Sequence, residues 1–454
     1  MRIFFLQIAV VLLALVVLNC RLVSAEQTIN LQVVWRHSLN HDEGWMYSVS
    51  ISSDGQTLAA GTSGGQVVVY SADGAFWDFQ TVGQYAEVSI SSNGQYIAAA
   101  VQATGSSAGA LYLFQRNNST PLWMHFGGSY WDAEISSDGN YIVAGSGGWI
   151  YTTDSVYLFE HNNATPVFSY NTSDNVQNVA ISSDGSYFAA SDDHNIYFFN
   201  TTASGPLWTY NIGYGPRTNL AITSDGNCLA AGVESAATEY QGDYLLYFSK
   251  GSGNPMWGSR LGGPVYSLTM SSDGSHIATI NDDGYVYSYQ GSTYAYKYGI
   301  CVPDRSTGEI FGSNVAMSAD GSYFATLSNR TISLFSKSST TPIYEYQAAH
   351  GVWGSTNGRP STAIASTSAG IRIVGSEFQL GNTDIILIGS SGAFSDWRVL
   401  VAIAITVVVV MSVVGLKIRK KPKSVTTSLQ PQPPPPPLSK TLEMSHSLKS
   451  VTRA

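Results

Sequence analysis

Charged residues are scarce in this chain, at 12% of 454 residues. Ten of the 22 lysines and arginines and one of the 31 acids lie before residue 26 or after residue 416. Residues 26–416 therefore carry 22 − 10 = 12 bases against 31 − 1 = 30 acids, a net charge of −18. A body this acidic argues against nucleic acid as a partner, because phosphate binding needs clustered cations. Few charges with 27 tyrosines and 44 glycines favour strands and turns over helices.

Cysteine is also rare, with three residues. Cys20 lies in an N-terminal leader, which leaves Cys228 and Cys301, and the sequence has no CxxC motif. This argues against a structural zinc or dithiol redox site. Whether Cys228 and Cys301 form a disulfide stays open, because they fall at non-equivalent places in different repeats. None of the eight histidines has a recognisable metal-ligand spacing.

Two apolar segments are targeting or anchoring signals. Residues 1–25 have a basic start, an apolar run and a small-residue end, which predicts a cleavable signal peptide. Residues 399–416 are uncharged and mostly apolar, and at ~1.5 Å per residue they just span a ~30 Å hydrocarbon core. The basic run "KIRKKPK" follows and predicts a cytoplasmic C-terminus. We therefore expect a single-pass membrane protein with residues 26–390 outside the cell, a connector at 391–398 and a cytoplasmic tail at 417–454.

A short phrase recurs along the chain, as in "AISSDGSYFAAS" at 180–191. Alternating apolar residues on both sides of Asp-Gly predict a tight β-hairpin. The copies are spaced 39 to 49 residues apart, a period typical of a four-stranded propeller blade. Aligned on the turn glycine, they fall at Gly55, Gly94, Gly139, Gly185, Gly226, Gly274, Gly321 and, in a weaker copy, Gly370.

Two further strands complete each repeat. The third resembles "SVYLFE" (155–160), and the fourth begins with proline and an aromatic residue, as in "PLWTY" at 206–210. The last copy, with strands near 361–366, 371–375 and 384–389, lacks a fourth strand, and "LQVVWRHS" (31–38) can supply it. We expect an all-β fold, an eight-bladed β-propeller whose N-terminal strand closes the last blade. Seven blades is the alternative, if residues 361–389 do not form one.

These motifs resemble the WD-repeat and quinoprotein-like (PQQ-like) β-propeller superfamily over roughly residues 30–390. The regular "GH…WD" pairs of eukaryotic WD-repeat proteins are absent. The resemblance implies a propeller but little about activity. Trp123, Trp208 and Trp257 are similar to the docking tryptophans of quinoprotein dehydrogenases. Those enzymes hold a calcium-bound quinone under a vicinal disulfide, and this chain has no adjacent cysteine pair. The resemblance to the dehydrogenases therefore ends at the fold.

A ring of polar residues is expected on the innermost strands, around a central channel. Oxygen ligands from adjacent blades could bind Ca²⁺ or a polar ligand there, or the residues could form a satisfied, water-filled wall, which we favour. The candidate ring comprises Glu87, Asp132, Glu134, Asn178, Asn219 and Asn314. The run "SDDH" at 191–194 is interpreted as a solvated turn rather than a catalytic or metal site.

Aromatic residues and an arginine gather in the loops that lead into the first strands. Exposed side chains of these types provide binding hot spots, although several could instead cap the blade core. The candidate binding face comprises Trp45, Tyr47, Tyr85, Tyr130, Trp131, Tyr214, Arg217 and Tyr266.

Glycosylation sequons and a proline-rich tail add two further expectations. N-x-S/T sequons occur at Asn117, Asn118, Asn163, Asn171, Asn200 and Asn329. Several share one loop position, so glycans there would shield one face and leave the opposite face open. The tail segment 430–440, "QPQPPPPPLSK", is typical of polyproline II. It could dock on a cytoplasmic polyproline-binding module or act as a spacer.

The sequence thus favours a non-enzymatic cell-surface recognition, adhesion or scaffold protein that binds a protein or glycan outside the membrane. We expect no catalytic residues and no bound cofactor or metal. The alternative is a membrane-tethered enzyme or solute-binding protein that uses the central channel.

Overall fold

The computed structural model of the chain describes residues 31–390 except 40–43, 45, 72–75, 106–107, 149–153, 216–217, 236–241, 282–284, 291–292, 300–313, 329–330, 340, 348–361, 368–369 and 380–381. The chain divides into two compact units, Met1–Ser395 and Asp396–Ala454, and all described residues belong to the first. The predicted signal peptide (1–25), connector (391–398), transmembrane helix (399–416) and tail (417–454) lie outside the described residues. No helix within the described part of the chain is long and apolar enough to cross a membrane.

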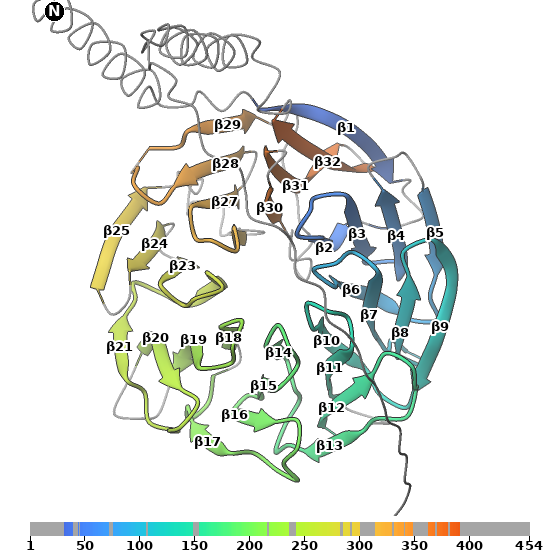
Figure 1. Ribbon diagram of the computed structural model, residues 1–454, viewed down its shortest axis with the longest axis vertical. Helices are drawn as coiled ribbons and strands as arrows, with labels where there is room; N and C mark the ends of the chain where they lie inside the picture. The colour runs from blue at the N-terminus through green and yellow to red at the C-terminus, as the bar shows by residue number, and fades with distance from the viewer. Residues whose placement is uncertain are drawn as a thin grey trace, which may run out of the picture. The chain divides into compact units, whose positions relative to one another are not determined.

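The described residues form eight four-stranded antiparallel sheets, which surround a common centre as the blades of a propeller (Figure 1). Within each sheet the first strand of the blade lies innermost and the fourth lies at the rim. The predicted eight-bladed propeller is confirmed, and the seven-bladed alternative is not. All the secondary structure of the described residues is β-structure and turns, as the low charge and high tyrosine content predicted.

The strands follow the blades in chain order. Blade 1 contains β2 (Met46–Ile51), β3 (Thr57–Thr62), β4 (Gln66–Ser71) and β5 (Phe76–Gln80). Blade 2 contains β6 (Gln84–Ile90), β7 (Tyr96–Gln102), β8 (Ala110–Gln115) and β9 (Asn118–Phe126). Blade 3 contains β10 (Tyr130–Ile135), β11 (Tyr141–Ser146), β12 (Ser155–Glu160) and β13 (Phe168–Asn171). Blade 4 contains β14 (Asn178–Ile181), β15 (Tyr187–Ser191), β16 (Asn195–Asn200) and β17 (Trp208–Asn211).

The second half of the ring repeats the pattern. Blade 5 contains β18 (Thr218–Ile222), β19 (Cys228–Ser235), β20 (Gly242–Ser249) and β21 (Trp257–Arg260). Blade 6 contains β22 (Val265–Met270), β23 (His276–Asn281), β24 (Tyr285–Gln290) and β25 (Thr293–Gly299). Blade 7 contains β26 (Asn314–Met317), β27 (Tyr323–Ser328), β28 (Thr331–Ser336) and β29 (Tyr344–Gln347). Blade 8 contains β30 (Ala363–Thr367), β31 (Gly370–Gln379), β32 (Asn382–Ser390) and, from the N-terminus, β1 (Leu31–Leu39).

The hydrophobic core lies between neighbouring blades and is supplied mainly by the second and third strands. These strands are buried on both faces, so their sequences are nearly continuous apolar runs, as in β8. The fourth strands instead alternate between half-buried and exposed residues. Aromatic pairs fill the interfaces; the rings of Phe188 and Phe199 stack with centroids 4.8 Å apart.

Hydrogen bonds at each Asp-Gly turn explain the repeated phrase. In blade 6, Ser271 Oγ donates to Asp273 Oδ1 (2.7 Å) and accepts from the backbone N–H of His276 (3.0 Å). Asp273 also accepts from the N–H of Ser275 (2.9 Å), and Gly274 has a positive φ of 71°. The bonds from Ser271 and Ser275 lower the pKa of Asp273 to about 2. A Ser or Thr hydroxyl takes the same place in six other blades, at Ser52, Ser91, Ser136, Ser182, Thr223 and Ser318.

The turns and the outer tryptophans also join successive blades. The backbone N–H of Ser183 donates to the carbonyl of Ser224 in the next blade (2.9 Å), and this link recurs from turn to turn. At the rim, the indole N–H of Trp208 donates to the carbonyl of Lys250 in the next blade (3.1 Å). Trp77 and Trp123 make equivalent bonds of 2.7 and 2.8 Å. Trp123 and Trp208, which resemble quinoprotein docking residues, are therefore structural contacts between blades, and Trp257 stacks on Tyr289 of the next blade with ring centroids 6.0 Å apart.

The N-terminal strand closes the ring as predicted. β1 pairs antiparallel with β32 from Leu31 opposite Ser390 to Leu39 opposite Thr383. Leu31 packs with Ile386 and Ile388 in the core between blades 7 and 8. Arg36 Nη2 donates to Tyr346 Oη of blade 7 (2.6 Å). One blade is thus built from both ends of the propeller sequence, which covers the sheet edge that β32 would otherwise expose.

Replacing Ile386 with alanine tests this closure. Ile386 is fully buried beside Leu31, so the Ile386→Ala variant should lose about 2–5 kcal/mol of unfolding free energy. Denaturant titration of the full-length chain in mild detergent measures the change. Leu207→Ala removes an exposed side chain from the rim of blade 4 and should cost less than about 0.5 kcal/mol. Equal losses in the two variants would contradict the closure.

Candidate binding face

The antiparallel order of each blade divides its loops between two faces of the ring. The Asp-Gly hairpins and the loops between third and fourth strands lie on one face, called here the hairpin face. The loops that lead into the first strands and the turns between second and third strands lie on the other, called here the loop face. All eight predicted binding residues belong to the loop face in sequence, although Trp45 and Arg217 lie outside the described residues.

Four of these predicted residues share a local geometry that the sequence does not reveal. The first strands of blades 1, 2, 3 and 6 each carry a β-bulge at the loop face, where one residue is skipped in the pairing with the second strand. A bulge turns its extra residue out of the regular alternation. The skipped residues are Tyr47, Tyr85, Trp131 and Tyr266, which are called here the bulge collar.

Tyr47 and Tyr85 form the best-defined part of the bulge collar. Their rings lie 5.5 Å apart, and Tyr47 Oη accepts from Gln102 Nε2 (3.2 Å). Tyr85 has a φ of 53°, the one positive value among the described non-glycine residues. Its N–H donates to the carbonyl of Ser63 in blade 1 (3.1 Å). Such a backbone costs about 1–3 kcal/mol, and strain of this kind gathers at functional sites.

The other two collar residues are also anchored and half-buried. Trp131 Nε1 donates to the carbonyl of Gly147 in the same blade (3.0 Å), which fixes the indole against the turn between β11 and β12. Tyr266 packs on the core between blades 6 and 7. Each ring is therefore held in place while part of it stays accessible, as expected of a preformed binding surface.

Tyr130 does not belong to this surface. Its side chain is fully buried between blades 2 and 3, where Oη lies 2.5 Å from His125 Nδ1. Burial raises the pKa of the Tyr130 phenol above its ordinary value. The expectation of an exposed Tyr130 was wrong because the bulge begins one residue later. Tyr130 keeps the inward register and Trp131 takes the outward position.

Beside the collar, Tyr214 is the most exposed predicted residue that the structure describes, with a relative accessibility of 52%. Its ring lies 5.6 Å from that of His194. The Nδ1 atom of His194 in turn lies 3.8 Å from Asp174 Oδ2. These three residues come from the loops of blade 4 and from the loop that leads into blade 5.

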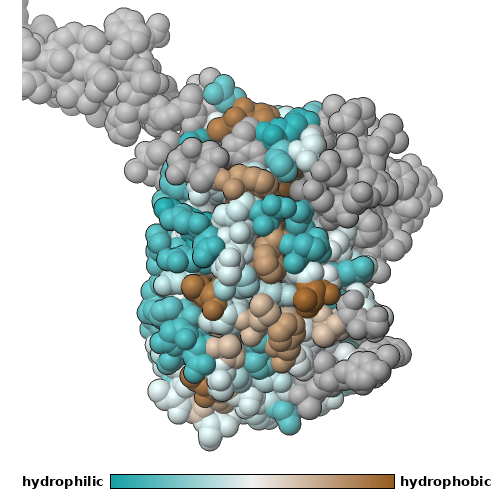
Figure 2. All heavy atoms as spheres, turned by 90° about the vertical axis from the view of Figure 1, so that its right-hand side faces the viewer, coloured by the Kyte–Doolittle hydropathy of each residue, from teal (hydrophilic) through white to brown (hydrophobic). Residues whose placement is uncertain are grey.

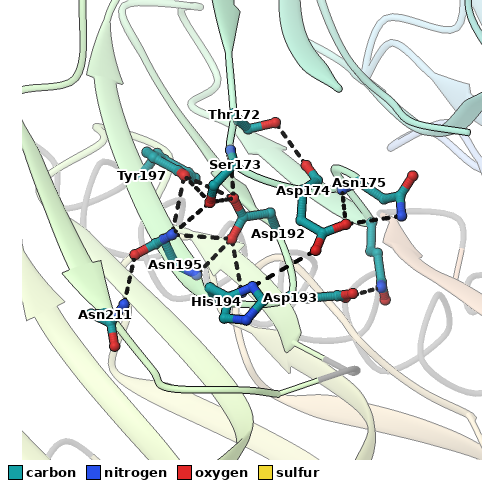
Figure 3. A network of polar contacts seen from close by, with 11 residues as sticks. Thr172, Ser173, Asp174, Asn175, Asp192, Asp193, His194, Asn195, Tyr197 and Asn211 are labelled. Carbon is teal, nitrogen blue, oxygen red and sulfur yellow. Dashed lines mark hydrogen bonds and ion pairs between the residues drawn. The ribbon is translucent and has the colours of Figure 1, made fainter. Parts of the chain in front are cut away.

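A buried aspartate holds these loops together (Figure 3). Asp192 is only 2% exposed and accepts from the hydroxyls of Ser173 and Tyr197, both at 2.7 Å. It also accepts from the backbone N–H groups of His194 (2.8 Å) and Asn195 (2.6 Å). The sequence interpretation of 191–194 as a solvated turn is therefore wrong for Asp192. A buried carboxylate with this many donors fixes the turn and the loop that contains Ser173.

Three other carboxylates near His194 make this part of the loop face acidic. Burial raises the pKa of Asp193, and the negative charges of Asp174 and Asp192 raise it further. The pKa of Asp154 is raised for the same reasons. Gln177 Nε2 donates to Asp193, and Asn175 donates to Asp174. Over the described residues, no group of three or more histidine, cysteine or acidic side chains has an arrangement that could hold a metal ion.

The predicted channel ring is engaged in bonds between blades. Asp132 accepts from the N–H of Val179 in the next blade (2.8 Å), and Asn178 accepts from that of Leu220 in the blade after (2.8 Å). Glu134 likewise accepts from the N–H of Ile181, Ser267 from that of Val315 and Asn314 from that of Thr362. Asn219 instead donates its side-chain N–H to the carbonyl of Val265 in the next blade. Glu87 accepts from Ser48 Oγ of the preceding blade (2.7 Å).

Glu134 is electrostatically unfavourable in this wall. Burial raises its pKa to about 8, with further contributions from the charges of Asp132 and Glu87. The residue is partly exposed, and solvent screening of that part limits the cost in stability. The bond from the Ile181 N–H (3.2 Å) opposes the shift only in part. The carboxylates of Glu87, Asp132 and Glu134 therefore repel one another, although Asp132 and Glu134 each accept a backbone hydrogen bond from blade 4.

The sequons and Cys228 are placed as follows. Asn117, Asn118, Asn163 and Asn171 are exposed and Asn200 is half-buried, whereas Asn329 lies outside the described residues. Asn117, Asn118, Asn163 and Asn200 lie on the hairpin face, as predicted. Cys228 is a free thiol, and its candidate partner Cys301 lies outside the described residues.

Two segments of the chain match the family model of the WD domain, G-beta repeat, at residues 34–71 and 164–200. Each segment starts at the fourth strand of one blade (β1 or β13) and ends with the third strand of the next (β4 or β16). Together with the eight-bladed ring, these matches support a WD-repeat propeller. A comparison with curated proteins found no match.

The pH dependence of Glu134→Gln tests the channel wall. The carboxyl of Glu134 ionises near its ordinary pKa of 4.5 when the chain is unfolded and near 8 when it is folded. Its contribution to stability is therefore full below pH 4.5 and is lost as the pH rises toward 8. Between pH 5 and pH 8 the wild type should lose about 1–3 kcal/mol more unfolding free energy than the variant. Denaturant titrations across this range measure the difference, and parallel profiles would contradict it.

Proposed function

We propose that this protein is a non-enzymatic recognition or adhesion protein that binds a protein or glycan ligand on its loop face. The bulge collar carries the proposal. In four inner strands the regular pairing with the second strand is interrupted by a bulge at the equivalent position. In each case the residue turned outward is Tyr or Trp. A bulge that recurs in this way is a feature that re-aims a side chain. Aromatic rings held rigidly at a surface supply binding energy at a low entropic cost.

The surroundings of the collar support a polar ligand with exposed donors. Asp174 and Asp193 make the neighbouring loops of blade 4 acidic, while Tyr214 offers an accessible aromatic face. A basic protein segment or the hydroxyls of a glycan would meet these groups favourably. WD-repeat propellers generally mediate protein–protein interactions, which favours a protein partner.

The channel offers less support for the alternative of a propeller enzyme or solute-binding protein. Asp132, Glu134 and Asn178 each accept a backbone N–H from the next blade. A ligand or Ca²⁺ ion that drew on these oxygens would have to compete with the bonds that hold the inner strands together. The engaged wall therefore favours the loop face as the binding surface.

The proposed setting is the cell surface. The signal-like segment 1–25 and the apolar segment 399–416 followed by basic residues support a single-pass anchor with the propeller outside. Asn117, Asn118, Asn163 and Asn200 on the hairpin face suit a glycoprotein, whereas Asn171 lies at the loop-face end of β13, so a glycan there would lie on the loop face. The proline-rich segment 430–440 would then lie in the cytoplasm, available to a polyproline-binding module.

A photo-crosslinking amino acid at position 214 tests the loop face. In intact cells it should capture a partner protein or glycoconjugate, because Tyr214 is half-exposed beside the collar. Trp131→Ala, introduced in the same chain, should lower the captured amount at least about tenfold, the effect expected of a hot-spot aromatic residue. Mass spectrometry of the conjugates gives both readouts.

The matched control places the crosslinker at position 95, an exposed residue in an Asp-Gly-type turn of the hairpin face. It should capture little, and Trp131→Ala should leave that capture unchanged. Equal capture from both positions, or full capture by the Trp131→Ala chain, would contradict a binding face at the collar.

Protease protection tests the proposed topology and glycosylation. Protease added to intact cells should remove the propeller and leave a membrane-embedded C-terminal fragment. Replacing Asn118, Asn163 and Asn200 with Gln should increase mobility in denaturing gels by the loss of attached glycans. A propeller that resists protease until the cells are lysed would contradict the topology, and unchanged mobility would contradict the glycans.

A further inference from the structure

The fourth strand of blade 2 is one of the longer outer strands. β9 runs over nine residues, Asn118–Phe126, as β1 does, and β25 has seven, whereas β13, β17, β21 and β29 have four residues each and β5 has five. The pairing of β9 with β8 shifts register between Leu113 and Gln115, and Trp123–Phe126 form its continuous part. Among the described residues, β9 pairs only with β8, so its other edge is open along the rim of the ring. A long open edge presents unpaired backbone N–H and C=O groups to a further strand.

The exposed side chains of β9 are all apolar over its second half. Leu122, Met124 and Phe126 are 46, 39 and 52% exposed. The repeat provides its own comparison, because the last two exposed positions of the fourth strand are mostly polar in other blades: Asp78 and Gln80, Ser169 and Asn171, Thr209 and Asn211, Gly258 and Arg260, and Glu345 and Gln347. Blade 2 alone among these has an apolar residue at both positions.

The apolar stripe on β9 continues toward the loop face. Met124 lies opposite Tyr112 in the pairing of β9 with β8. The phenol oxygen of Tyr112 accepts from the N–H of Val82, whose side chain is 48% exposed. Figure 2 looks at the rim from the side of β5 and β9 and shows apolar residues scattered among hydrophilic ones there. Val82 is thus a further exposed apolar residue on a rim of mixed polarity (Figure 2).

We propose that β9 is the contact strand of a homodimer, in which it pairs antiparallel with β9 of a second copy of the chain. This proposal is independent of ligand binding on the loop face. An edge strand that meets its own copy across a two-fold axis closes the edge on both sides and cannot propagate into a fibre.

Charge favours a second copy as the occupant. Residues 26–416 carry a net charge of −18, so two copies repel each other unless they meet at an uncharged surface. β9 contains no Asp, Glu, Lys or Arg. Its one titratable group, His125, is inward-facing, and burial lowers its pKa. Because β9 carries no charged side chain, two copies can meet there without placing like charges opposite each other.

The direction of the backbone groups selects one register. In blades 3, 4, 5 and 7 the residue after the proline donates its N–H to the third strand, as Leu207 does to Phe198 (2.7 Å). Leu122 holds that position in β9. The N–H of Ile212, four residues after Trp208, also donates to the carbonyl of His194 (2.8 Å), so the backbone groups of Trp208, and of Trp123 at the same place in β9, face the third strand. Backbone groups alternate along a strand, so Met124 and Phe126 direct theirs to the open edge. A two-fold axis at Met124 pairs the backbone of Met124 with that of Met124 in the second copy.

The side chains fit the same register. Met124 meets the Met124 of the second copy, and Leu122 meets the second Phe126, so the apolar face of the stripe becomes continuous across the dimer. Pro121, which has no N–H to offer, falls at the end of the paired segment. Asn118 lies beyond that segment, so a glycan there would not enter the strand pairing.

A charge-swap experiment on the full-length chain in mild detergent tests the dimer. Wild type should be dimeric by sedimentation velocity and native mass spectrometry. Met124→Glu and Met124→Lys each place like charges opposite each other at the axis, and each should weaken dimerisation at least about tenfold. Mixing the two variants should restore a dimer that contains one chain of each. Only direct contact between the two copies of residue 124 produces this rescue.

Thr209→Glu and Thr209→Lys are the matched controls, because Thr209 holds the equivalent exposed position in blade 4. Both should remain dimeric. Circular dichroism and thermal unfolding that match wild type show that the Met124 variants are folded, as expected for an exposed position. A monomeric wild type, a dimer that survives both Met124 substitutions, or a mixture that stays monomeric would overturn the proposal. Monomers that capture an unrelated protein through Met124 would identify a different occupant and also overturn it.

Discussion

The bond from an inner-strand side chain to the backbone of the next blade is the interaction on which the rest of the structure depends. A blade has two apolar faces, and it can bury both only if it is held at a fixed angle between two neighbours. Asn178 and Asp132 fix that angle close to the axis of the ring, where one oxygen receives the N–H of the next inner strand. At the rim, the indole of Trp208 makes the corresponding link. Ring closure through β1 extends the same constraint to the last blade.

The candidate binding face follows from this constraint. With the inner strands held by their polar side chains, a bulge in one of them alters a single residue and leaves the rest of the strand in register. Tyr85 and Trp131 are turned outward in this way while their strands keep their contacts with the neighbouring blades. Blade 4 has no such bulge in its described first strand. There the hydrogen bonds to the buried Asp192 carboxylate hold the loops in place instead. The result is a rigid ring in which recognition can vary residue by residue.

The fold could be predicted from the sequence because the same hairpin motif recurs eight times at a period typical of propeller blades. The Asp-Gly turn fixes the hairpin, and the missing fourth strand near residue 390 matches the extra strand at residue 31. The candidate site could be predicted only in part. The sequence places Tyr47 and Trp131 near the loop face. Tyr130 and Trp131 are both aromatic, so residue types do not show which of the two the bulge turns outward, and Tyr130 was assigned to the wrong side. Asp192 was missed because its partner Ser173, 19 residues earlier in the chain, is brought beside it only in the folded blade.

The measurement that tests the account most directly is amide hydrogen exchange at the inner strands. Asn178→Ala removes the acceptor for the N–H of Leu220 and leaves the strand pairing of β18 with β19 in place. The account predicts that exchange at Leu220 accelerates by about tenfold or more, the loss of roughly one hydrogen bond, while amides on blade 8 are unaffected. Unchanged exchange at Leu220 would show that the inner-strand side chains do not hold the blades together. It would instead favour the interpretation that they bind a ligand in the channel.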